Sequence, residues 1–172
     1  TTLTVSAIDP KSGEKSAIPA NFNNLCSTNR VVASTGENYA IRNKEGKLFR
    51  WPTLKNKYIL IDFWASWNPE SVAEQDSLER VIKALRKENF VIVSISLDYD
   101  KQAWMKASDR DTTQWIQLCD FKGWKNTTVE EQNIQSLPSN ILLTPNKQII
   151  ERNIRGQKLI DKIKQLTKDD KR

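Results

Sequence analysis

Two cysteines and a few carboxylates are the residues of this chain best suited to chemistry. Cys26 and Cys119 lie far apart in the sequence and lack the spacing of metal ligands. They form a disulfide in an oxidising compartment or remain two thiols in a reducing one, and the sequence leaves both alternatives open. The chain has no histidine, which excludes Ser-His-Asp and Cys-His catalysis and imidazole metal sites. We therefore predict neither a metal site nor a cofactor.

Three carboxylates are candidates for acid–base chemistry. Asp62 interrupts an apolar run, and Glu70 and Glu74 are i, i+4 neighbours on one face of a predicted helix. Acids near the start of a helix commonly complement its dipole. The sequence supplies no nucleophile, metal or phosphate-binding loop to work beside them. Hydrolysis by these carboxylates is therefore disfavoured.

Composition indicates a soluble protein of 172 residues with one main domain. Hydrophobic residues make up 38% and charged residues 28%, and no apolar run approaches the roughly 20 residues of a membrane span. The net charge is +6, but the basic residues are scattered and follow no nucleic-acid-binding motif. We interpret them as solvated surface and predict no nucleic-acid partner.

The elements that position these residues begin with two apolar runs, at 58–64 and 90–97. Both have the length and composition of strands covered on both faces, which indicates a central, partly parallel sheet. Between them, Asn68 is a good N-cap and Pro69 suits the first helical position. Leu78, Val81, Ile82 and Leu85 then recur at helical spacing. The segment is therefore predicted to be a βαβ unit with a right-handed crossover.

The rest of the chain divides into an N-terminal extension, residues 1–40, and the main domain, residues 41–172. In the extension, alternation from Leu3 to Ala7 predicts an edge strand, and Pro and Gly then break the pattern. The sequence 43–46 predicts the turn of a hairpin. We also expect strands at 31–33, 39–42, 47–50, 140–144 and 148–154, helices at 100–110, 129–134 and 159–166, and a packed apolar insertion at 112–125.

The order of these elements, together with several local sequences, resembles the thioredoxin fold. The sequences are "ILIDFWASW", "VSISLD", "FKGW" and "SLPSNILL". More narrowly, residues 43–166 resemble the TlpA/ResA-like branch of envelope thiol-disulfide oxidoreductases. The resemblance implies an α/β fold with a central mixed β-sheet flanked by helices, here with an N-terminal β-arm.

The reactive motif of that family is changed in this chain. The family's pattern is Trp-Cys-x-x-Cys, whereas Trp67 is followed here by Asn68-Pro69-Glu70-Ser71. An amide and an unassisted hydroxyl do not perform thiol exchange, since the thiolate is the nucleophile. We therefore expect no catalytic residue at Asn68 or Ser71. Two explanations of Asn68 and Pro69 stay open. The residues changed toward a more stable helix start once catalysis was lost, or they keep a role in binding.

Other positions of the family are kept. Leu137-Pro138 matches the cis-proline bond that faces the motif and presents backbone to an extended peptide. Asp62 matches a buried acid beneath the second cysteine, and Glu74 matches a glutamate on the first helix. Without a cysteine above it, Asp62 is interpreted as a buried carboxyl hydrogen-bonded to Ser71 or water, with a raised pKa if it is isolated.

These residues predict a redox-inactive thioredoxin-fold module that binds a protein or peptide, or serves a structural role. Its predicted binding residues are Trp67, Asn68, Pro69, Leu137, Pro138 and Ser139. The alternative is a thiol-disulfide oxidoreductase that uses Cys26 and Cys119. A structural disulfide between these two cysteines is a simpler interpretation than a catalytic one. The resemblance implies a bacterial envelope location, periplasmic or extracytoplasmic. A membrane tether upstream of Thr1 and the oligomeric state are left open.

Overall fold

The computed structural model describes residues 7–8, 15–16, 41–110 and 113–172. The chain divides into a unit of residues 1–30 and a unit of residues 31–172. In the first unit, β1 (Ala7–Ile8) pairs antiparallel with β2 (Lys15–Ser16). Cys26, Leu3 and the predicted strand 31–33 lie outside the described residues. The predicted boundary between residues 40 and 41 stays a prediction.

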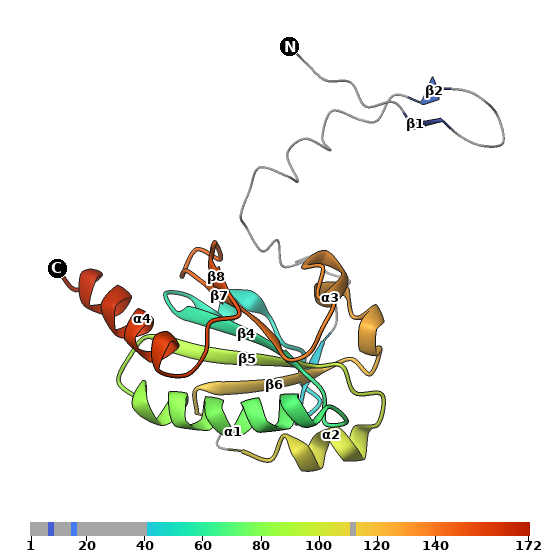
Figure 1. The fold of residues 1–172 in the computed structure, drawn as a ribbon, viewed down its shortest axis with the longest axis horizontal. Helices are drawn as coiled ribbons and strands as arrows, with labels where there is room; N and C mark the ends of the chain where they lie inside the picture. The colour runs from blue at the N-terminus through green and yellow to red at the C-terminus, as the bar shows by residue number, and fades with distance from the viewer. Residues whose placement is uncertain (1–6, 9–14, 17–40, 111–112) are drawn as a thin grey trace. The chain divides into compact units, whose positions relative to one another are not determined.

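The second unit is built on a six-stranded mixed sheet with the order β3-β6-β5-β4-β7-β8 (Figure 1). Strands β4, β5 and β6 are parallel to one another, and β3, β7 and β8 pair antiparallel with their neighbours. The mixed sheet predicted from the sequence is confirmed. The strands are β3 (Arg42–Asn43), β4 (Tyr58–Trp64), β5 (Phe90–Ser96), β6 (Trp115–Cys119), β7 (Ser139–Leu143) and β8 (Ile149–Arg152).

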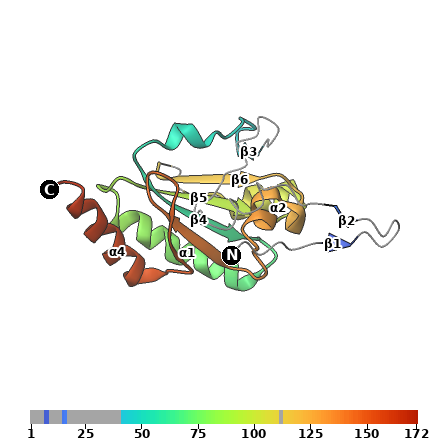
Figure 2. The same cartoon turned by 90° about the horizontal axis from the view of Figure 1, so that it is seen from above.

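Both faces of the central strands are buried, as their continuous apolar runs predict. One face, with Leu60 and Ile92, packs against the helices α1 and α4. The opposite face, with Ile61 and Val93, packs against Val129 and neighbouring loops. Figure 2 shows the strands β6, β5 and β4 side by side, together with α1 and α4. The helices are α1 (Pro69–Ala84), α2 (Lys101–Ala107), α3 (Thr127–Glu131) and α4 (Gly156–Asp169), with 3-10 turns at Trp51–Leu54 and Gly123–Lys125.

Two predictions on the edge of the sheet need correction. The apolar insertion at 112–125 contains a strand, β6, which pairs parallel with β5. The sequence obscured it because the polar Gln117 lies in its middle, although that side chain is buried. The predicted hairpin keeps its turn, where Asn43 Oδ1 accepts the N–H of Lys47 at 2.9 Å. Its second arm, predicted at 47–50, is reduced to a single bridge between Leu48 and Arg42.

Candidate binding site at the start of helix α1

Helix α1 begins where the sequence predicts, directly after strand β4. Asn68 is its N-cap, and the Asn68 Oδ1 atom accepts the backbone N–H of Ser71 at 2.7 Å. Pro69 occupies the first helical position, where a missing N–H costs no hydrogen bond. Trp67, just before the cap, exposes 51% of its surface. The turn is therefore a satisfied helix start with a large aromatic residue beside it.

An open cleft of about 600 Å³ lies next to this turn. One wall comes from Glu70, Ala73 and Glu74 of α1, and the other from residues 136–138 and Arg155. The Leu137–Pro138 peptide bond is cis. Of the predicted binding residues, the structure places Leu137 and Pro138 on the cleft wall, whereas Trp67, Asn68, Pro69 and Ser139 are not among its lining residues.

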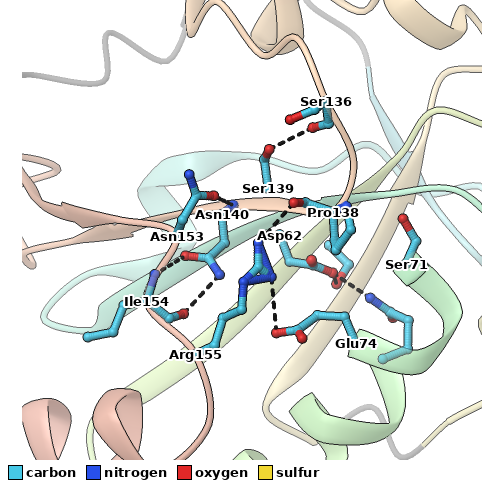
Figure 3. A network of polar contacts seen from close by, with 12 residues as sticks. Asp62, Ser71, Glu74, Ser136, Pro138, Ser139, Asn140, Asn153, Ile154 and Arg155 are labelled. Carbon is cyan, nitrogen blue, oxygen red and sulfur yellow. Dashed lines mark hydrogen bonds and ion pairs between the residues drawn. The ribbon is translucent and has the colours of Figure 1, made fainter.

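Ser139 is bonded within the protein through its side chain, and its predicted binding role stays a prediction. Its side chain is buried, and its hydroxyl donates to the carbonyl oxygen of Ser136 at 2.6 Å (Figure 3). The residue starts β7, where it pairs in register with Phe63 of β4. Ser139 thus braces the segment before it against the sheet, and its side chain is already engaged within the protein.

Asp62 lies in the core behind the cleft and is 1% exposed. Its Oδ2 atom accepts hydrogen bonds from Gln75 Nε2 and Ser94 Oγ, both at 2.6 Å. The predicted partner Ser71 was wrong, because within the described chain the buried Ser71 Oγ has no hydrogen-bond partner. Burial raises the pKa of Asp62 from 3.8 to about 6, and the two hydrogen bonds oppose that rise.

The polar network around Asp62 extends across three strands, and sequence reasoning missed most of it. Ser94 Oγ also accepts the indole N–H of Trp115 at 2.8 Å. Gln117 Nε2 lies 3.5 Å from Gln75 Oε1, at the limit of a hydrogen bond. A serine inside the apolar run of β5, in register with Asp62, was the available signal. The network satisfies groups that would otherwise be costly to bury.

A second buried acid, Asp98, fixes the turn that carries Trp67. Its carboxylate accepts the backbone N–H of Ser66, at 3.1 and 3.2 Å to its two oxygens, and the Ser66 and Ser96 hydroxyls. Asp98 follows the apolar run of β5 directly and was not among the predicted site residues. Its bonds join the turn after β4 to the end of β5, so Trp67 projects from a rigid support.

Cys119 is packed in the interior beside Trp64 and Trp104. It is 2% exposed and forms no disulfide within the described residues, and its sulfur lies 3.6 Å from the carbonyl oxygens of Ser96 and Asp98. Burial raises the pKa of this thiol from 9.0 to about 11. Because Cys26 lies outside the described residues, the predicted Cys26–Cys119 disulfide stays a prediction.

Comparisons with known proteins place this geometry in a family. A family model described as thioredoxin-like matches residues 56–149. A thiol-disulfide oxidoreductase from Bacteroides fragilis NCTC 9343 is 37% identical with a TM-score of 0.67, covering 74% of this chain and 96% of that chain. This chain belongs to the thioredoxin-like thiol-disulfide oxidoreductase family.

Further relatives of this thioredoxin-like chain come from the same bacterial genus. The C-terminal domain of a putative thiol-disulfide oxidoreductase from Bacteroides thetaiotaomicron is 34% identical, with a TM-score of 0.67 over 76% of this chain and 92% of that one. A putative thiol-disulfide oxidoreductase from Bacteroides vulgatus is 29% identical, with a TM-score of 0.63 over 74% and 85%. The search of curated proteins gave no match.

Two further features of the thioredoxin-like chain concern metals and membranes. Within residues 7–8, 15–16, 41–110 and 113–172, no group of three His, Cys, Asp or Glu side chains is arranged to hold a metal ion. Among the helices of the same ranges, none combines the length and apolar character needed to cross a bilayer.

Proposed function

We propose that this chain is a redox-inactive member of its family that binds an extended peptide or protein client in the bacterial envelope. The observation that carries the proposal is the start of α1. Asn68 and Ser71 stand where the family pattern has its two cysteines, and the Asn68 side chain itself accepts the Ser71 N–H. In the family that helix terminus lowers the pKa of a thiol. Here it serves as an ordinary helix cap.

The client surface proposed here combines Trp67 with the backbone of Leu137. Trp67 is exposed and supported by the Ser66–Asp98 bonds, which lowers the entropy lost on binding. Within the described chain the N–H and C=O of Leu137 have no hydrogen-bond partner, and the residue borders the cleft. An extended client segment would pair with this backbone in the manner of an added strand.

The redox part of the proposal is tested by insulin reduction. With dithiothreitol as the electron source, we expect the purified protein to accelerate insulin precipitation no more than buffer does. Turnover that survives in a variant with both Cys26→Ser and Cys119→Ser would contradict the redox-inactive proposal and also the alternative that the two cysteines carry the activity. Turnover that disappears in Cys119→Ser would instead establish the alternative, an oxidoreductase working through the cysteines outside the motif.

Replacing Trp67 with alanine is expected to weaken client binding without unfolding the protein. If Trp67 is a hot spot of the client interface, its truncation costs about 2 kcal/mol, which corresponds to a loss of affinity of about thirtyfold. The probe is fluorescently labelled, reduced and carboxymethylated lactalbumin, a permanently unfolded polypeptide, followed by fluorescence anisotropy. Trp124→Ala is the matched control, because Trp124 is 39% exposed and belongs to the 3-10 turn Gly123–Lys125 rather than to the turn before α1. Equal affinity of the wild type and Trp67→Ala would remove Trp67 from the site.

The Cys119 thiol is expected to resist alkylation in the folded protein. It is almost fully buried and its pKa is about 11, so both access and the thiolate fraction at pH 8 are low. Labelling of a Cys26→Ser variant with iodoacetamide, followed by mass spectrometry, should be slower than in the urea-unfolded protein by about 100-fold or more. Labelling at comparable rates in the two states would favour a reactive Cys119 and hence the oxidoreductase alternative.

A further inference from the structure

Arg155 joins the two walls of the cleft. Its Nη2 atom donates to the carbonyl oxygen of Pro138 at 2.9 Å. Its Nη1 atom lies 3.6 Å from Glu74 Oε1, within ion-pair distance but too long for a hydrogen bond. Figure 3 shows the guanidinium between the helix α1 and the segment before β7. One side chain therefore links the cis-proline segment to the first helix.

The backbone that carries Arg155 is itself fixed to β7. The carboxamide of Asn140 donates to the Ile154 carbonyl at 2.9 Å and accepts the Ile154 N–H at 3.1 Å. The backbone N–H of Asn140 donates to Asn153 Oδ1 at 3.1 Å, and the Asn153 N–H donates to the Asn140 carbonyl at 2.9 Å. These bonds hold the connection between β8 and α4 in register, so the origin of the Arg155 side chain is well defined.

The Arg155 bond decides which backbone groups face the cleft. The Ser136 carbonyl accepts the Ser139 hydroxyl, and the Pro138 carbonyl accepts Arg155. Proline has no backbone N–H to offer. Among residues 136–138, Leu137 is therefore the residue whose N–H and C=O both lack a partner in the described chain. Without Arg155, the Pro138 carbonyl would be a second unpaired acceptor.

We propose that Arg155 is a positioning residue of the client-binding cleft, which holds the Pro138 carbonyl and Glu74 so that Leu137 presents its backbone to the client. This inference rests on the proposed peptide-binding function. The proposal does not require Arg155 to recognise a charge on the client, since the Arg155 side chain is 33% exposed and its guanidinium already contacts Glu74 and the Pro138 carbonyl. The role is to set the geometry of the cleft.

The electrostatics of Glu74 provide a readout that depends on this role. Its side chain is 13% exposed, and burial raises the pKa of Glu74 whereas the nearby Arg155 cation lowers it. The other acids nearby are Asp62, whose pKa is itself raised in part by Glu74, and Glu70 on the exposed side of α1. Removing the cation should therefore raise the pKa of Glu74 further.

The test compares Arg155→Ala and Arg155→Lys with the control Arg152→Ala. Arg152 also donates to a backbone carbonyl, that of Gln132 at 3.3 Å, but lies outside the cleft lining. We expect Arg155→Ala to bind the carboxymethylated lactalbumin probe about tenfold more weakly, with partial recovery in Arg155→Lys and no change in Arg152→Ala. The backbone amide chemical shifts of Leu137 and the NMR titration of the Glu74 carboxyl should change in Arg155→Ala and not in the control.

The outcomes separate this inference from the function on which it rests. If the wild type binds the probe and Arg155→Ala binds equally well, with the Leu137 amide chemical shifts and the Glu74 titration unchanged, the positioning role is overturned. If the wild type does not bind, the proposed function fails. In that case, the chemical-shift and titration measurements still decide whether Arg155 sets the geometry of the cleft. A thermal unfolding curve for each variant shows that these comparisons are made on folded protein.

Discussion

Replacing Asp62 with asparagine is expected to stabilise the protein at pH 7 by up to about 3 kcal/mol. The pKa of Asp62 rises from 3.8 to about 6 on folding, and one pKa unit corresponds to about 1.4 kcal/mol. The principal cause is the cost of burying the charge. Asparagine has no charge to desolvate, and its carbonyl oxygen can accept from Gln75 and Ser94 as the carboxylate does. Urea unfolding at pH 7 measures the difference.

The pH dependence of the free energy of unfolding tests the sign of the Asp62→Asn effect a second time. Because the folded-state pKa is raised, the folded protein binds a proton at Asp62 more tightly than the unfolded chain does. The penalty is therefore absent below about pH 4 and fully present above about pH 6. Between pH 7 and pH 4.5 the wild type should gain stability relative to Asp62→Asn, and the difference between the two should shrink.

An exposed acid serves as the control for this measurement. Asp109 exposes 88% of its side chain, so Asp109→Asn should change the free energy of unfolding by no more than about 0.5 kcal/mol at either pH. Destabilisation by Asp62→Asn at pH 7 would mean that the hydrogen bonds to the ionised carboxylate outweigh its desolvation. Asp62 would then be a stabilising member of the network, and its pKa would lie below its ordinary value of 3.8.

The parts of the fold that the sequence predicted are those governed by local pattern. The runs that form β4 and β5 are long and continuous, and the Asn68-Pro69 pair determines the start of α1 through bonds to its own neighbours. The burial of Asp62, which the resemblance to the family implied, also agrees with the structure. The two strands and the start of α1 depend on residues close together in the chain.

The parts that could not be predicted depend on contacts between distant segments. The pairing of Gln75 and Ser94 with Asp62 arises only when α1 and β5 pack on β4. Arg155 reaches Pro138 because the Asn140 side chain holds the end of β8 against β7. No local periodicity marks such residues, since an arginine after a strand is most often a solvated surface residue. Strand β6 was not predicted for a related reason. Gln117 in its middle is polar, as residues of loops commonly are, and its burial depends on packing against distant segments.

Restoring the two sulfurs is expected to create a thiol-disulfide oxidoreductase. In the double variant Asn68→Cys, Ser71→Cys, the first thiol would lie at the N-terminus of α1, where the helix dipole lowers a thiol pKa. The substitution also removes the Asn68 side chain that now accepts the Ser71 N–H, which frees that donor for a thiolate. Residues three apart in the first turn are near neighbours, as disulfide geometry requires. Insulin reduction should rise from the buffer rate to clear turnover.

The single variants separate sulfur chemistry from general effects of substitution. Asn68→Cys alone should form mixed disulfides but not turn over, because the resolving thiol is absent. Ser71→Cys alone should be inert, because position 71 is fully buried.

If the double variant forms the 68–71 disulfide and still fails to reduce insulin, loss of sulfur would not be a sufficient reason for inactivity. The cleft itself, with Glu70 and Glu74 on one wall, would then have diverged from one that accepts a disulfide substrate. Activity in the double variant would instead show that the rest of the fold still supports thiol-disulfide exchange. Residues 68 and 71 alone would then separate this chain from its catalytic relatives.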